Sequence, residues 1–136
     1  MNDLKYKKFE FFNFYKGVPK YIQKFLIENY KCIFDEFTIR NDLRIDCVPA
    51  PIVTFDKKKF GFGAFDSKHK RIVIGCKPGS MMLSWKRSEY IRIVLESLIH
   101  ELIHYEQYRT QDGLMHHRGI ERKTREIANK ILGVTD

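Results

Sequence analysis

The sequence predicts a single α+β domain, in which an N-terminal helix is followed by a small sheet of three to four strands and then by two further helices. Three observations predict this order. The first third of the chain is aromatic with helix-like spacing, the middle third contains short extended segments, and the last third is apolar with a helical period. The chain has 136 residues, 43% of them hydrophobic, which suffices for one buried core. We therefore expect one domain over residues 1–136.

Helical spacing begins after Pro19, because proline is favoured in the first turn of a helix. Apolar side chains then recur every three to five residues, as they do in an amphipathic helix. These side chains are Tyr21, Phe25, Leu26, Tyr30 and Ile33. A denser aromatic stretch over residues 9–15 precedes them and is expected to pack in the core. The chain up to about Phe37 is thus expected to be helix-like.

The middle third is expected to form three or four strands in an antiparallel or mixed sheet, since its extended segments are joined by short turns. The expected strands are residues 43–48, 52–55, 60–65 and 70–76. Pro49 and Pro51 are expected to end the first of them. Gly61 and Gly63 lie inside the third, which indicates that another group approaches the backbone there.

A wide apolar band in the last third predicts a helix that is largely buried. It is expected to begin at Ser84 or Ser88, since either serine can cap a helix N-terminus. The apolar pattern ends at Asp112 and Gly113. Beyond them, apolar and small side chains at three- and four-residue steps predict a second helix over about residues 120–132.

The buried helix carries an H-E-x-x-H motif, His100-Glu101-Leu102-Ile103-His104. Residues four apart on a helix share a face and lie about 6 Å apart, so that two imidazole nitrogens can converge on one ion. Zinc suits such a site because it keeps an open position and lowers the pKa of its water towards about 7. Glu101 can take a proton from that water and pass it to a leaving amine. The motif predicts Zn²⁺ bound by His100 and His104, with Glu101 as general base and acid.

A third protein ligand has to come from elsewhere in the chain. The candidates after the motif are His116, His117, Glu121 and Glu126. Glu126 lies five residues past Glu121, about 140° around a helix, and is expected at the surface. Spacing alone leaves the two histidines and Glu121 open.

Residues 121–132 (E-R-K-T-R-E-I-A-N-K-I-L) resemble the E-x-x-A-x-x-F-A-x-x-L-L helix of ImmA/IrrE-type and other small gluzincin metallopeptidases, including minigluzincin-like ones. The resemblance implies a minimal zincin-like domain that hydrolyses peptide bonds, with Glu121 as the third zinc ligand. Thr124 stands where the family has alanine, and Ile127 where it has phenylalanine. The segment over residues 61–74 resembles the sheet of such enzymes, in which an edge strand pairs with the substrate backbone.

Two alternatives remain from the sequence. The segment His116-His117-Arg118-Gly119 resembles part of the SprT-like proteases, which use a third histidine and act on DNA-bound proteins. Under that interpretation His116 or His117 binds the metal. If neither does, one of them can donate a hydrogen bond to an oxyanion. The second alternative is a zinc-stabilised binding module that has the motif but no turnover.

The chain carries a net charge of +8 and a pI near 9.4, which favours anionic partners. Basic residues gather at residues 57–59, 68–71 and 86–87 and along the last helix. They are compatible with proximity to nucleic acid and equally with a solvated surface. No apolar run reaches the length of a membrane span. The polar, charged residues 1–8 lead us to expect no classical signal peptide, and the three cysteines are too far apart to predict a disulfide framework. We therefore expect a cytoplasmic protein with a protein or peptide substrate and no membrane partner.

Overall fold

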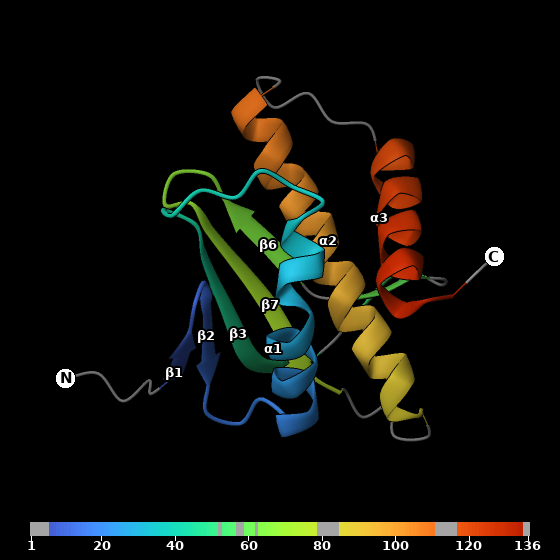
Figure 1. Cartoon of the computed structure of the whole chain (residues 1–136). Helices are drawn as coiled ribbons and strands as arrows, with labels where there is room; N and C mark the ends of the chain where they lie inside the picture. Colours follow the sequence, from blue (N-terminus) through green and yellow to red (C-terminus); the bar gives the residue numbers. More distant parts are fainter. Residues whose placement is uncertain are drawn as a thin grey trace.

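A computed structural model of the chain describes residues 6–51, 53–56, 59–61, 63–78, 85–110 and 117–134. Its strands are β1 (Tyr6–Phe9), β2 (Phe12–Tyr15), β3 (Arg44–Pro51), β4 (Val53–Asp56), β5 (Lys59–Gly61), β6 (Gly63–Asp66) and β7 (Arg71–Lys77). Its helices are α1 (Lys20–Phe34), α2 (Arg87–Thr110) and α3 (His117–Leu132). Figure 1 shows the sheet on one side of the molecule and α2 between the sheet and α3.

Five strands form one mixed sheet in the order β1-β2-β3-β7-β6. The three central strands, β2, β3 and β7, run parallel to one another, whereas β1 and β6 are antiparallel to their neighbours. A separate two-stranded sheet pairs β4 with β5. The α+β class and the mixed sheet are confirmed, but the sheet has five strands instead of the three to four expected.

The expectation that a helix opens the domain is wrong, because residues 6–15 form the β1–β2 hairpin ahead of α1. Glu10 turns the chain between the strands with a φ of 53°, in the left-handed region. Phe12 and Phe14 are both buried, on either side of Asn13, which is the two-residue period of a strand. The aromatic stretch does pack in the core, as expected, but it does so as a strand.

Two expected strand boundaries also differ from the structure. Strand β3 continues through Pro49 to Pro51, and its pairing with β7 shifts register between Val48 and Pro51. The prolines therefore lie at an irregular end of the ladder, where fewer backbone donors are needed. The expected strand over residues 60–65 is divided between β5 and β6, which belong to different sheets.

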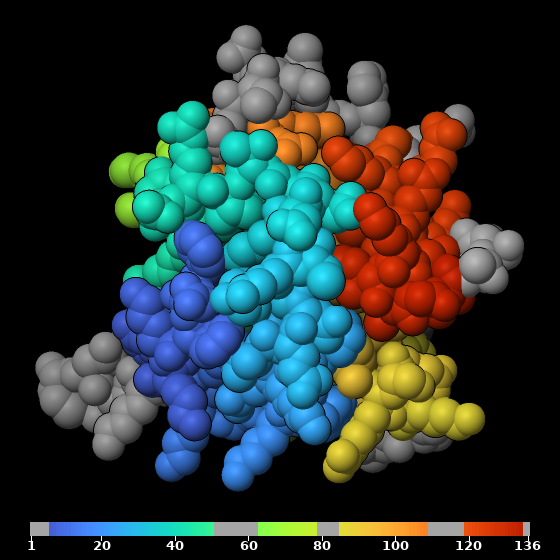
Figure 2. All heavy atoms as spheres, viewed as in Figure 1, coloured from blue at the N-terminus to red at the C-terminus, as the bar shows by residue number. Residues whose placement is uncertain are grey.

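One face of the main sheet forms the core with α1 and α2. The strand register aligns Phe12 with Ile45 and Ile72, and Phe14 with Cys47 and Ile74, and all of these are buried. Helix α1 begins after Pro19, as expected, and its Tyr30 and Phe34 rings contact the Phe12 ring. Figure 2 shows α1 packed between the β1–β2 hairpin and α3. The expected number of three helices is confirmed in the described residues, but α1 follows two strands and is not the first element of the chain.

Helices α2 and α3 pack as an antiparallel pair. Arg92 Nη2 donates to Asn129 Oδ1 at 2.6 Å near the start of α2, and Lys123 lies 3.8 Å from Glu106 near its other end. Helix α2 begins at Arg87, where the Lys86 backbone N–H donates to Glu89 Oε1 at 2.8 Å. The expected break at residues 112–113 lies outside the described residues. Within the described part of the chain, no helix has the length and apolarity needed to cross a membrane.

Candidate metal centre

Helix α2 brings the two motif histidines together. His100 and His104 lie one turn apart, and their Nε2 atoms are 3.0 Å from each other. Their ring centroids are 4.7 Å apart and the rings are inclined by 70°. Both side chains are half-buried, while Leu102 and Ile103 between them are buried in the core. The buried helix therefore holds two imidazole nitrogens that point to one place.

The spacing of these two nitrogens is close to that of two ligands on one zinc ion. Zinc binds imidazole nitrogen at about 2.0–2.1 Å with tetrahedral angles, which places two such ligands about 3.4 Å apart. The observed separation of 3.0 Å is within a few tenths of that value. The nitrogens thus lie slightly closer together than two ligands of one zinc ion, at a distance that also suits a direct N–H···N hydrogen bond. They would have to move apart by about 0.4 Å to share an ion.

Glu101 is buried beside the histidine pair, with 7% of its surface exposed. Burial raises the pKa of this carboxyl group to about 7. A carboxyl with such a pKa can both accept and release a proton near neutral pH. This pKa belongs to the metal-free protein, and a cation held by the two histidines would lower it.

Gly63 in β6 lies directly against Glu101. A Cβ at position 63 would be 3.0 Å from Glu101 Cγ and 3.1 Å from Oε2, closer than ordinary van der Waals contact. The expectation that another group approaches the backbone at the strand glycines is thus confirmed for Gly63. The absent side chain leaves room for the carboxylate between the helix and the strand.

Strand β6 is the edge strand of the main sheet next to α2. It pairs antiparallel with β7 on one side, and no described strand pairs with its other side. Ala64 and Asp66 are exposed along it. The edge that runs past Glu101 can therefore offer backbone hydrogen bonds to an extended chain.

The structure brings no third ligand from its described side chains together with this pair. Glu121 is exposed in the second turn of α3, and Glu126 is exposed further along, as expected. His116 lies outside the described residues, and only the backbone of His117, the first residue of α3, is described. Among the described side chains, no group of three histidines, cysteines or acidic residues is positioned to hold a metal ion.

Two further residues of α2 connect the motif helix to the segment after α1. The Arg40 backbone N–H donates to Tyr105 Oη at 3.1 Å, and the Thr38 N–H donates to Glu106 Oε2 at 3.0 Å. Tyr105 is fully buried, so packing and anchoring account for it. Patterns in the sequence do not reveal these two contacts, because the partners lie more than sixty positions away.

None of three comparisons, with protein-family models, with curated proteins and with solved structures, finds a match for this chain.

Proposed function

We propose that this protein is a zinc-dependent metallopeptidase. The observation that carries the proposal is the convergence of His100 and His104, 3.0 Å apart at Nε2, next to the buried carboxylate of Glu101. Convergent imidazoles beside a buried carboxylate suit hydrolysis better than a purely structural site. A structural zinc site has no need of a proton acceptor in this position.

His100 and His104 would hold the metal through Nε2. Zinc held there would supply the Lewis acidity that activates water and polarises a carbonyl group at neutral pH. Glu101 would accept the proton of the attacking water at its carboxylate and deliver it to the departing amine. Gly63 keeps the space in which that carboxylate lies.

Glu121 is our proposed third ligand. The contacts of Arg92 with Asn129 and of Lys123 with Glu106 fix α3 antiparallel to α2. This packing, with Glu121 two residues before Lys123, supports Glu121 as a ligand that could reach the half of α2 that carries the histidines. The small, fully buried Ala128 two turns further on allows the helices to approach each other.

The substrate would be an extended peptide segment added to the free edge of β6. Backbone pairing at this edge would bring a scissile bond past Glu101, since Gly63 belongs to the same strand. We also propose that the protein acts in the cytoplasm. This location is supported by its three unpaired cysteines, two of them buried as thiols in the core.

The proposal is tested by hydrolysis of a fluorogenic peptide library with zinc-loaded protein. Glu101→Gln should abolish cleavage and retain the metal, because the amide cannot accept a proton. Glu96→Gln is the matched control on the same helix, where the carboxylate pairs with Arg92 at 3.0 Å. It should cleave like the wild type. Cleavage that persists in Glu101→Gln would overturn the proposal, and zinc-loaded wild type without any cleavage would favour the binding module.

A further inference from the structure

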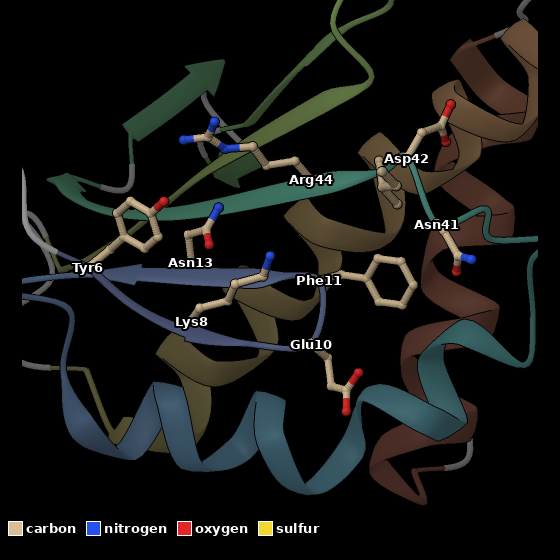
Figure 3. A pocket seen from close by; sticks show the side chains of 9 residues that line it. Tyr6, Lys8, Glu10, Phe11, Asn13, Asn41, Asp42 and Arg44 are labelled. Carbon is tan, nitrogen blue, oxygen red and sulfur yellow. The ribbon is translucent and has the colours of Figure 1, made fainter.

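The face of the main sheet that points away from α1 and α2 carries an open cavity of about 410 Å³ (Figure 3). Its lining includes Tyr6, Lys8, Asn13, Asn41, Asp42 and Arg44. All of its lining residues come from the β1–β2 hairpin, from residues 41–43 and from Arg44, the first residue of β3. None belongs to α2, so the cavity is separate from the histidine pair. Its volume is within the range of ligand sites, about 300–1,000 Å³.

The guanidinium group of Arg44 is fixed at one end of this cavity. Its Nε donates to Asp46 Oδ1 at 2.9 Å, its Nη2 donates to Tyr15 Oη at 3.2 Å, and it lies 6.0 Å from the centre of the Tyr6 ring. The Arg44 side chain nevertheless remains 47% exposed. An arginine oriented in this way loses little conformational entropy when it binds an anion.

Positive charge exceeds negative charge only at the end of the cavity that holds Arg44, because the lining carboxylates of Glu10 and Asp42 lie toward its other end (Figure 3). Asp46 is fully buried and also accepts from Arg71 Nε, so one carboxylate serves two guanidinium groups. The Arg71 side chain is 40% exposed beside it. Lys8 adds an exposed ammonium group from β1, opposite Asn13 in the hairpin. The chain as a whole carries +8, which attracts polyanions to the protein in general.

An exposed aromatic ring lies at the same end. Tyr6 is 45% exposed, and its ring contacts that of Tyr15 at a centroid distance of 5.0 Å. Tyr6 and Lys8 are two positions apart in one strand, so they project from the same face. Aromatic rings next to cations on an open sheet are suited to stacking bases while the cations contact phosphates.

We propose that this cavity binds a nucleotide unit of a single-stranded nucleic acid, with the base against Tyr6 and a phosphate on Lys8 and Arg44. Asn41 and the carboxylate of Asp42 line the far side of the cavity (Figure 3). An amide and a carboxylate can bond the donor groups of a base edge or a sugar hydroxyl. Glu10 and Asp42 would repel a second anionic group there. The cavity thus fits a base with one phosphate better than it fits an acidic peptide. This site does not depend on the proposed peptidase activity.

The test is fluorescence anisotropy of a short labelled oligouridine and a matching oligothymidine, titrated with the full chain at several salt concentrations. Tyr6→Ala should weaken binding at least about fivefold through lost stacking. Lys8→Ala should lower the slope of log affinity against log salt by about 0.7. Lys24→Ala removes an exposed lysine from α1 and is the matched control, which should bind like the wild type. Unlabelled uridine monophosphate shows whether a free nucleotide enters the same site: competition that Tyr6→Ala weakens supports the site.

Three results would overturn the proposal: no binding of either oligonucleotide at low salt, equal losses in Lys8→Ala and Lys24→Ala, or competition by polyglutamate as strong as that by the oligonucleotide. The last result would assign the face to acidic proteins. Because Tyr6 and Lys8 are partly or fully exposed in a two-stranded edge, circular dichroism is expected to show both variants folded. Glu101→Gln should bind like the wild type, so this outcome is independent of the peptidase test.

Discussion

Replacing Asp46 by asparagine is expected to lower the free energy of unfolding by about 2–3 kcal/mol at neutral pH. Asp46 is fully buried in β3, where Oδ1 accepts from Asn13 Nδ2 at 2.8 Å and from Arg44 Nε at 2.9 Å. Oδ2 accepts from Arg71 Nε at 2.5 Å. In Asp46→Asn the side-chain NH₂ group would face one of these donors, and the negative charge that pairs with the two arginines would be lost. The partly exposed arginines can turn to water, which keeps the cost at the lower end for a buried ion pair.

The loss should depend on pH in a defined direction. Burial alone would raise the pKa of Asp46, but the hydrogen bonds from Asn13, Arg44 and Arg71 outweigh it, so the pKa lies below its usual value. A carboxyl with a lowered pKa stabilises the fold above its unfolded pKa of about 3.9, and this contribution is lost as pH falls through the folded pKa. The difference between wild type and Asp46→Asn should therefore be full near pH 6 and shrink below about pH 4.

Urea unfolding followed by circular dichroism measures this difference. A loss of 2–3 kcal/mol corresponds to a fall in melting temperature of about 8–12 °C for a domain of this size. Asp66→Asn is the matched control, because Asp66 is an exposed carboxylate in β6 whose partners are local. Equal destabilisation by the two substitutions, or an Asp46 effect that is the same at low and neutral pH, would refute this account of the buried carboxylate.

Three further predictions concern α2 and the strand β6 that packs against it. Gly63→Ala should displace Glu101 by a few tenths of an ångström and lower peptidase activity about tenfold at unchanged zinc content, whereas Ala64→Ser should not. In metal-free protein Glu101→Gln should stabilise the fold by about 3 kcal/mol at pH 8 and not at pH 4, since the raised pKa of Glu101 makes stability fall as pH rises to about 7. Tyr105→Phe should cost about 1 kcal/mol in urea unfolding, because the Arg40 N–H loses its acceptor.

Local patterns in the sequence were sufficient for α1, for the strand that contains Ile72 and for the motif helix. Each of these elements has its own period, and α1 also has Pro19 ahead of its first turn. The hairpin over residues 6–15 was missed, because five aromatic residues in seven satisfy both a helical and a two-residue period. The alternation of apolar Phe12 and Phe14 with polar Asn13 was a signal for a strand. Asn13 is itself buried, and its side chain donates a hydrogen bond to Asp46 in β3.

The candidate site also has a part that the sequence predicts and a part that depends on tertiary packing. A helix fixes the relation of His100 to His104, so the spacing alone predicts their convergence. The position of Glu121 relative to the histidines depends on how α3 packs against α2. Contacts between distant residues, such as Lys123 with Glu106, determine that packing, so spacing in the sequence could not predict the third ligand. The glycine at position 63 indicated that some group approaches the backbone there. That this group is Glu101 could not be predicted, because β6 and α2 are far apart in the sequence.

The most direct test of the zinc site is elemental analysis of purified wild type beside His104→Ala, Glu121→Ala and the double variant His116→Ala/His117→Ala. We predict one zinc ion per chain in the wild type, lost in His104→Ala and Glu121→Ala and retained in the double variant. Loss of zinc only with the two histidines would make His116 or His117 the third ligand. A wild type that holds no zinc, even after reconstitution, would contradict the proposed metallopeptidase.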